Sequence, residues 1–372
     1  MLQKALVVVL VFASVAGFVS CSSKTSSHYV YATVPAASQL AVFREDPFSG
    51  VLTQLSASPY TVGNGAQALV IHPSGKFLYV ANPGQGENDV SLFTINSDGT
   101  VTEVTPRTPV GTLPFLMAMD SAGSFLYVAN ALSNNISVFS INATDGTLTA
   151  VGTNCAQDPQ VCSPFPINLS PSSMQLSPSG NFLYVSAPSS PTGKIAVFSL
   201  TAGVPTLVSL TPTADNNPSG IAIDPGGAYL YAANSTANSI SIYCIAPCQT
   251  ATVPGTLQEV PQSPLADNSQ RPVALILDPT GKFLYVANQG SSNIGTYSIT
   301  SGTGFPVAIT ASPFGSQGQP SFLVADPSGK YLFVGNQGGN SGIQAFGVAS
   351  GSLNSIATYP VGNTPTSIAV LQ

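Results

Sequence analysis

Residues 120–130 read DSAGSFLYVAN, a turn followed by a short apolar strand, and this segment decides the fold because it recurs along the chain. Close copies stand at 72–82 (HPSGKFLYVAN) and 278–288 (DPTGKFLYVAN). Further copies lie at 177–187, 224–234 and 326–336, with a truncated copy at 28–33. Successive copies are about 50 residues apart, a period that is typical of solenoids and propellers.

Each repeat contains four strand-like runs joined by turns rich in Gly and Pro. The first run is short and apolar, as in 274–277 (ALIL), and the second is the FLYVAN-like segment, which is apolar on both faces. The third resembles 136–141 (ISVFSI), and a turn such as Asp98-Gly99, a strong hairpin signal, leads into the fourth. Four antiparallel strands in each repeat predict the blade of a β-propeller.

The two ends of the repeat array complement each other. The array begins at the second strand of a repeat, at Tyr29, and ends with an unpartnered first strand at 365–372. A solenoid would need polar capping repeats at both ends instead. We therefore expect residues 28–372 to form an all-β, seven-bladed propeller with four antiparallel strands per blade, whose ring is closed by the last strand pairing into the first blade.

The composition limits the classes of partner. The 372 residues include 9 Lys and Arg against 15 Asp and Glu, a formal net charge of -6, and 44% of residues are hydrophobic. That apolar content is sufficient for a large core. No two basic residues are adjacent, so the chain offers no basic stripe for phosphates, and we expect no nucleic-acid partner.

The N-terminus predicts export from a bacterial cytoplasm. Lys4 precedes an apolar run over 5–19, too short to span a bilayer but suited to a signal peptide over 1–20. Residues 18–21 (FVSC) resemble a lipobox, which predicts a lipidated Cys21, a short tether over 21–27 and an anchored protein in the cell envelope or periplasm. Ordinary cleavage and secretion is the alternative. We expect a monomer whose contact with membranes is made through this anchor.

Four further cysteines, in two pairs, fit an exported protein that forms disulfides. Sequence alone allows three connectivities. Cys155 and Cys162 fall in a connection between a fourth and a first strand, and Cys244 and Cys248 between a third and a fourth strand. Because these connections emerge at opposite faces of a propeller, we predict the pairs Cys155–Cys162 and Cys244–Cys248. The spacing of the cysteines, without a nearby His, does not suit zinc.

Residues 126–141 (LYVANALSNNISVFSI) carry a more specific resemblance. They resemble the YVTN repeat, and the whole array resembles the lactonase-like seven-bladed propeller family, which includes 6-phosphogluconolactonase and carboxymuconate-cyclase relatives. The resemblance implies the propeller fold. The motif residues belong to the blade core, so the family's chemistry has to be sought at the mouth of the channel.

The family's lactonases carry a Gly-Pro-Arg-His stretch before the first strand of a blade, and this chain keeps only its proline. The proline stands at Pro114, Pro171, Pro218, Pro272, Pro320 and Pro365. The positions of the Arg-His pair are occupied by Gln67-Ala68, Phe115-Leu116, Ser172-Ser173, Ser219-Gly220, Val273-Ala274, Ser321-Phe322 and Thr366-Ser367. No repeat keeps the pair, and this departure counts against the family's lactonase activity.

Sparse charged residues in the expected mouth loops supply the candidate site. The pairs Asp215-Asn216 and Asp267-Asn268, with Arg271 close by, are predicted to bind a ligand, since their oxygens could hold sugar hydroxyls or a calcium ion. The alternative is that these residues only form loop turns. We predict no metal site and no cofactor otherwise. The candidate catalytic residues, if the protein is an enzyme, are Glu87, Arg107, Asp215, Asp267 and Arg271.

Three functions fit these observations. The first hypothesis is an exported module that binds a glycan, a small molecule or a protein through its loop-bearing face. The alternative is a hydrolase for a lactone without a phosphate, in which Arg107 or Arg271 polarises the carbonyl and Glu87, Asp215 or Asp267 activates water. The third is a passive surface scaffold.

Overall fold

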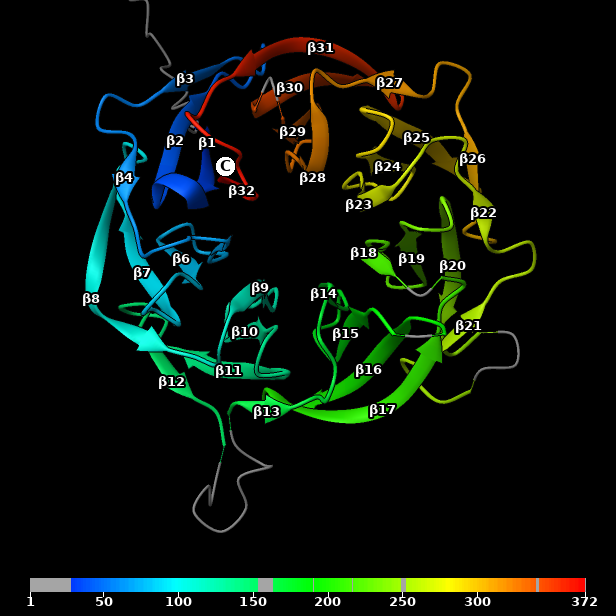
Figure 1. Ribbon diagram of the computed structural model, residues 1–372, viewed down its shortest axis with the longest axis horizontal. Helices are drawn as coiled ribbons and strands as arrows, with labels where there is room; N and C mark the ends of the chain where they lie inside the picture. Colours follow the sequence, from blue (N-terminus) through cyan, green and yellow to red (C-terminus); the bar gives the residue numbers. More distant parts are fainter. Residues whose placement is uncertain are drawn as a thin grey trace, which may run out of the picture.

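The computed structural model describes residues 28–152, 163–189, 191–215, 217–248, 252–338 and 341–371. In this part of the chain seven antiparallel sheets surround a central axis as the blades of a β-propeller (Figure 1). The predicted signal peptide, Cys21 and the tether lie outside the described residues, as do Asn216 and the pair Cys155 and Cys162.

The first four blades follow the chain, except that blade 1 also contains a strand from the C-terminal end of the repeat array. Blade 1 contains β1 (His28–Val34), β2 (Gln39–Glu45), β3 (Leu52–Gln54), the short β4 (Tyr60–Thr61) and β32 (Ser367–Leu371), with a 3-10 turn at Pro35–Ala37. Blade 2 contains β5 (Ala68–Ile71), β6 (Phe77–Asn82), β7 (Asp89–Ile95) and β8 (Val101–Pro109). Blade 3 contains β9 (Pro114–Met119), β10 (Phe125–Asn130), β11 (Asn135–Ile141), β12 (Leu148–Ala150) and β13 (Phe165–Pro166). Blade 4 contains β14 (Ser173–Leu176), β15 (Phe182–Ala187), β16 (Lys194–Thr201) and β17 (Val204–Pro212).

The other three blades repeat this order, with the first strand innermost. Blade 5 contains β18 (Pro218–Ile223), β19 (Tyr229–Asn234), β20 (Ser239–Ile245), β21 (Leu257–Glu259) and β22 (Leu265–Ala266). Blade 6 contains β23 (Pro272–Leu277), β24 (Phe283–Asn288), β25 (Asn293–Ile299), β26 (Pro306–Ala308) and β27 (Phe314–Gly315). Blade 7 contains β28 (Gln319–Ala325), β29 (Tyr331–Gln337), β30 (Gly342–Ala349) and β31 (Ser352–Tyr359).

The ring closes as the sequence predicts. Strand β32 pairs antiparallel with β1, with Tyr29 opposite Leu371 and Thr33 opposite Ser367. Blade 1 is therefore built from both ends of the repeat array, and β1 lies between β32 and β2. The predicted fold, including its closure by the last strand, is confirmed.

Tyrosines of the FLYVAN-like strands join neighbouring blades. The buried Tyr31 hydroxyl of blade 1 donates a hydrogen bond to the Gly99 carbonyl in the hairpin of blade 2, at 3.0 Å. Gly99 has φ +80°, a conformation that glycine adopts readily and that this hairpin requires. Equivalent bonds of 2.7 to 2.9 Å join later blades: Tyr79 to Gly146, Tyr184 to Gly255 and Tyr231 to Gly304. These bonds join blades 1 and 2, 2 and 3, 4 and 5, and 5 and 6, and apolar packing joins the other neighbouring blades.

The aspartates of the repeated turns serve the backbone. Asp120, Asp224, Asp278 and Asp326 each accept a hydrogen bond from the amide that begins the following strand, five residues later. His72 holds the same turn position in blade 2, where its Nδ1 lies 2.8 Å from the Ser74 hydroxyl. These polar side chains satisfy turn amides, as side chains in Asx turns do.

The structure joins Cys244, at the end of β20, to Cys248 in a disulfide whose Cα atoms are 6.4 Å apart. The loop between them is short, so the bond constrains little of the unfolded chain, and its contribution to stability is expected to be modest. No helix in the described residues has both the length and the apolar character needed to cross a membrane.

Candidate functional site

Two kinds of loop meet at one face of the ring, which we call the mouth face. They are the connections from a fourth strand to the next first strand and those between second and third strands. Asn88, before β7, shows the contact: its carbonyl accepts from the Val110 amide at 3.0 Å and its Oδ1 from the Leu113 amide at 2.7 Å. Both amides belong to the connection from β8 to β9. The central channel opens between these loops.

A β-bulge at the start of the first strand directs one residue of the blade to the channel. In blade 3, Asn130 pairs with Pro114 and Ala129 with Leu116, so Phe115 is the extra residue. The extra residues of blades 5, 6 and 7 are Ser219, Val273 and Ser321. Such bulges re-aim side chains. The four extra residues occupy the first position of the family's Arg-His pair. The bulge therefore explains how this position reaches the channel.

The channel mouth forms a cavity of about 320 Å³. Its wall consists of the residues at the former Arg-His positions and their neighbours on the first strands: Gln67, Ala68, Leu69, Phe115, Leu116, Met117, Ser172, Ser173, Ser219, Gly220, Ile221, Val273, Ala274, Leu275, Ser321, Phe322, Thr366 and Ser367. None of these lining residues carries a charge, and the wall combines hydroxyl groups with apolar side chains. The cavity therefore suits a neutral ligand.

Three hydroxyls of the wall are committed to neighbouring blades. Ser172 Oγ donates to the Pro218 carbonyl at 2.5 Å, and Ser219 Oγ donates to the Pro272 carbonyl at 2.8 Å. Thr366 Oγ1 donates to the Gln67 carbonyl at 2.8 Å. A hydroxyl has one proton to donate. These three can therefore only accept hydrogen bonds from a ligand.

Two other hydroxyls keep their protons for a ligand. Ser173 Oγ accepts from the Ile221 amide at 3.2 Å, and Ser367 Oγ accepts from the Leu69 amide at 3.3 Å. Each amide belongs to the next blade and fixes the serine oxygen as an acceptor. Ser173 and Ser367 are thus the hydroxyl donors that the cavity offers to a carbonyl oxygen.

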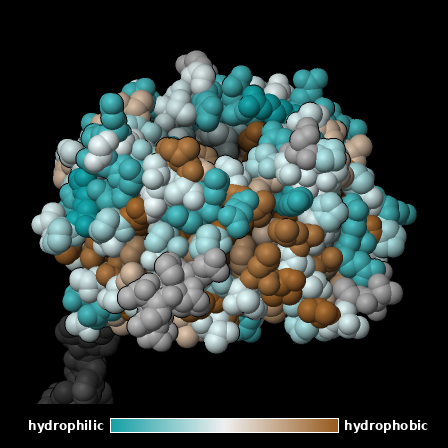
Figure 2. Space-filling model, turned by 60° about the horizontal axis from the view of Figure 1, so that its bottom comes forward, coloured by the Kyte–Doolittle hydropathy of each residue, from teal (hydrophilic) through white to brown (hydrophobic). Residues whose placement is uncertain are grey.

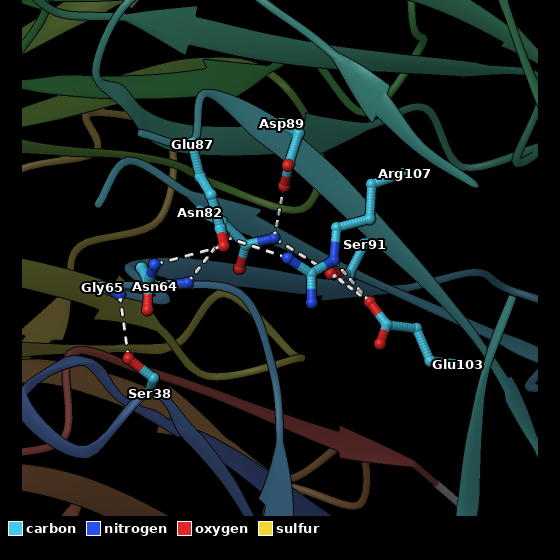
Figure 3. A network of polar contacts seen from close by, with 9 residues as sticks. All are labelled: Ser38, Asn64, Gly65, Asn82, Glu87, Asp89, Ser91, Glu103 and Arg107. Atoms are coloured by element: carbon cyan, nitrogen blue, oxygen red, sulfur yellow. Dashed lines mark hydrogen bonds and ion pairs between the residues drawn. The ribbon is translucent and has the colours of Figure 1, made fainter. Parts of the chain in front are cut away.

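Arg107 and Glu87, two of the predicted catalytic residues, do come together on the mouth face of blade 2 (Figure 3). Arg107 Nη1 lies 3.0 Å from Glu87 Oε2, and its Nε lies 2.7 Å from Glu103 Oε1. The bond to Glu103 raises the pKa of Arg107. Glu87 Oε2 also accepts from the Asn64 amide at 2.7 Å, so both partners are already engaged within the protein.

The same network continues into blade 2. Asn82, the last residue of the FLYVAN segment, donates to Asp89 at 2.7 Å and to Ser91 at 2.9 Å, and Ser91 donates to Glu103 at 2.9 Å. Burial raises the pKa of Asp89, against the opposing effects of Asn82 and Arg107.

This network positions the loops beside the channel. Glu87 holds Asn64, three residues before the channel residue Gln67, and the neighbouring Asn88 holds Leu113, two residues before Phe115. Arg107 fixes Glu87 from the other side. Arg107 and Glu87 therefore hold the loops from behind the channel wall, since neither of them lines the cavity.

The structure brings Asp215 and Asp267 to opposite sides of the turn between β19 and β20. Asp215 Oδ2 accepts from the amides of Thr236 at 2.7 Å and Ala237 at 2.9 Å. The Asp267 amide donates to the Asn238 carbonyl at 2.8 Å. These contacts agree with the alternative that Asp215 and Asp267 form loop turns.

Asp267 is buried and also serves its own loop. Its Oδ1 accepts from the Ser269 amide and from the Tyr297 hydroxyl, both at 3.1 Å. Burial raises the pKa of Asp267, opposed by these hydrogen bonds. Asn268 and Arg271 are exposed, and the Arg271 amide donates to Asn238 Oδ1 at 2.7 Å. The described residues contain no cluster of three or more His, Cys, Asp or Glu side chains that could hold a metal ion.

The serines, threonine and aromatic residues of the channel wall are absent from the sequence-based list of site residues. A signal for them exists, because each follows the repeated proline at the start of a first strand. Charged residues predict a site more directly than Ser, Thr or Phe do, and this position carries no charge in any blade.

The chain matches the family model described as lactonase, 7-bladed beta-propeller, over residues 23–165, 163–252 and 249–370. It is 25% identical to the 6-phosphogluconolactonase of Serratia proteamaculans over 354 residues, 92% of this chain and 98% of that protein. A 6-phosphogluconolactonase of Formosa agariphila is 40% identical over 79 residues, which are 21% of this chain and 22% of that relative.

Among solved structures, the periplasmic gluconolactonase of Pseudomonas aeruginosa superposes with a TM-score of 0.72 at 18% identity. The superposition covers 93% of this chain and 99% of that one, and at this identity it shows a shared fold. The family match extends over nearly all of the chain, through every blade that the structure describes. This chain belongs to the lactonase family of seven-bladed β-propellers.

Proposed function

We propose that the protein is a lactone hydrolase and that its substrate is an uncharged lactone bound at the mouth of the central channel. Family membership and the relatives named 6-phosphogluconolactonase support the reaction. The observation that carries the substrate class is the wall of the 320 Å³ cavity, which has hydroxyls and apolar groups but no charged side chain.

A phosphorylated lactone fits this cavity poorly. A phosphate brought out of water needs cations or several donors to replace its hydration. The committed hydroxyls of Ser172, Ser219 and Thr366 offer only acceptor positions, which repel an anion but suit the hydroxyl groups of a neutral ligand. A lactone without phosphate is therefore the better substrate for this chain.

Ring opening in this cavity would rely on hydroxyl donors. Either Ser173 in blade 4 or Ser367 in blade 1 would donate to the lactone carbonyl oxygen and stabilise the negative charge that develops when hydroxide from the solvent adds to the carbonyl carbon. The ring C–O bond then breaks, the ring oxygen takes up a proton, and the product is an open hydroxy acid. Because the wall holds no cation, the product carboxylate would leave readily. Arg107 and Glu87 act as positioning residues in this proposal, through the loops that they hold.

The first test measures the hydrolysis of several lactones by titrating the acid that each releases in a pH-stat. We expect turnover of δ-valerolactone and glucono-1,5-lactone above the spontaneous rate, and slower turnover of the 6-phosphate of the latter. With no titratable group in the wall, log kcat/KM is expected to follow hydroxide without a bend between pH 5 and 8. A bell-shaped profile would show that a charged residue outside the wall performs the chemistry.

The double substitution Ser173→Ala and Ser367→Ala provides the matched test of the donors. We expect it to lower kcat by roughly 100-fold, the usual effect of removing oxyanion donors. Ser298→Ala on β25 removes a hydroxyl that bonds to Val307 in its own blade, and it serves as the control. Equal effects of the two changes would contradict the assignment.

A second candidate is a binding module that retains neutral sugars or lactones without turnover. The composition of the cavity wall favours this candidate. Hydrolases commonly place a general base beside the substrate, and the residues that line this cavity include none. Retention of glucono-1,5-lactone in ligand-observed NMR, with no acid release above the spontaneous rate, would decide for this candidate.

We also propose that the protein is exported and anchored through lipid on Cys21. The apolar run and the lipobox-like residues before Cys21 support this proposal. Cells grown with labelled palmitate are expected to label the protein, and Cys21→Ser is expected to remove the label. Label that persists in the variant would exclude lipidation at this residue.

A further inference from the structure

Three exposed apolar side chains of blade 3 gather beside the channel, and we call them the blade 3 lip. Leu113, Phe115 and Leu132 are 40%, 37% and 69% exposed. The Leu132 amide donates to the Thr112 carbonyl at 3.2 Å, which places the loop after β10 directly beside Leu113. Phe115 also lines the cavity, so the lip is continuous with the proposed substrate site.

Leu113 is held in a conformation that leucine disfavours. Its φ is +60°, in the left-handed region, where the side chain crowds the backbone. Two contacts keep it there: its amide donates to Asn88 Oδ1 at 2.7 Å, and its carbonyl accepts from the Ala131 amide at 2.8 Å. Glycine would be the unstrained residue at this position. Arg271 has a similar φ of +55° directly before the proline of blade 6, so the connection itself uses this conformation, and what distinguishes blade 3 is the exposed apolar side chain at this place.

The rest of the ring makes the lip distinctive. At the bulge position of Phe115, the other blades place Gln67, Ser172, Ser219, Val273, Ser321 and Thr366, most of them polar. The exposed Leu207 and Leu210 belong to β17 on the outer wall, on the side of the ring where Figure 2 shows a hydrophobic area. The mouth therefore has exposed apolar side chains at blade 3, whereas five of the other six blades place a polar residue at this position.

We infer that the substrate is a lactone with an alkyl or aryl substituent, and that this substituent lies across Leu113, Phe115 and Leu132 while the lactone ring occupies the cavity. The inference rests on the proposed function, because it places the reacting ring in the same site. The polar wall receives the ring oxygens, and the lip removes the apolar substituent from water.

The test compares δ-valerolactone with δ-octalactone and δ-decalactone, which carry propyl and pentyl groups. Full burial of the substituent would raise kcat/KM about fourfold for each methylene. Because the lip covers only one side of the substituent, we expect kcat/KM to rise about twofold for each carbon, which gives a ratio of roughly 30-fold between δ-decalactone and δ-valerolactone. In the Leu113→Gly, Leu132→Ser double variant we expect this ratio to fall below about threefold. Leu113→Gly relieves the backbone, so the single variant is expected to keep its melting temperature.

Leu207→Ser on the outer wall is the matched control, because it removes an exposed leucine far from the loops of blade 3 and should leave the 30-fold ratio intact. Equal kcat/KM for all three lactones would overturn the inference and leave the hydrolase standing. Lip variants that change the oligomeric mass in light scattering while the ratio stays constant would also overturn it, because the lip would then be a protein interface.

A binding measurement separates failure of this inference from failure of the proposed function. If no lactone is hydrolysed, the hydrolase proposal fails, and saturation-transfer NMR with 2-piperidone and 6-pentyl-2-piperidone decides the inference alone. A stronger signal for the pentyl lactam, lost in the lip variant, would support it. Equal signals would overturn it.

Discussion

Replacing Glu45 with glutamine is expected to stabilise the protein above pH 7, by up to about 3 kcal/mol. Glu45 lies at the end of β2 with 1% exposure, and within the described residues neither of its side-chain oxygens accepts a hydrogen bond. His28 Nδ1, opposite it on β1, is 3.8 Å away, beyond hydrogen-bonding distance. A buried carboxylate without donors is costly, whereas an amide of the same shape carries no charge.

The sign of the pH dependence follows from the direction of the pKa shift. Burial, together with the charges of Asp326 and Asp46, raises the pKa of Glu45 from 4.5 to about 7. The unfolded chain therefore loses this proton near pH 4.5 and the folded chain near pH 7. Relative to Glu45→Gln, the wild-type protein should lose stability as the pH rises from about 4.5 to 7 and then level off. A shift of this size corresponds to about 3 kcal/mol.

Urea unfolding of both proteins at a series of pH values between 4 and 8 measures this difference. Glu259→Gln is the control, because Glu259 is exposed, and its replacement should change stability by less than about 0.5 kcal/mol at every pH. A pH-independent difference between wild type and Glu45→Gln would contradict the assignment of Glu45 as the titrating group.

Gly335→Ala is expected to destabilise the protein by about 1–3 kcal/mol, although alanine is the residue at this repeat position in five other blades. Gly335 lies on β29, opposite Phe322 on β28. A Cβ built on Gly335 would overlap the Phe322 ring at Cζ, so the glycine provides space for the ring. Phe322 fills the second position of the former Arg-His pair, and its ring packs into the blade core.

A double-mutant cycle isolates this cause. In a Phe322→Ala background, Gly335→Ala no longer meets the ring and is expected to cost little, so the coupling between the two sites should account for most of the loss. Thermal unfolding of the four proteins provides the measurement. A cost of Gly335→Ala that is the same in both backgrounds would show that backbone effects, not the ring, are responsible.

Most of the fold could be predicted from the sequence because the same structural unit repeats along the chain. The FLYVAN segments, the Asp turns and the complementary ends at 29 and 365–372 fix the number of blades and the closure, and each depends on local patterns. The roles of Asp120 and Asp278 as turn acceptors follow equally from their spacing to the next strand. Hydrogen bonds between residues that are close in the sequence can therefore be predicted from it.

The candidate site was less predictable, since it depends on how blades face one another. Spacing gave no sign that Arg107 would pair with Glu87 and Glu103, because the three residues come from a loop and from β8. The bulge that presents Phe115 and the direction in which Ser172 donates are set by the neighbouring blade. The left-handed Leu113 likewise depends on Asn88 from blade 2.

The partnership of β1 with β32 also has a consequence for biosynthesis. The first strand made cannot acquire its inner neighbour until residues 367–371 have been synthesised, so the circular architecture is fastened only at a late stage. Until then both edges of the open array are unpaired and available to other chains. In the export that we propose, the chain would cross the membrane as an extended thread, and this delay would favour translocation before the ring closes.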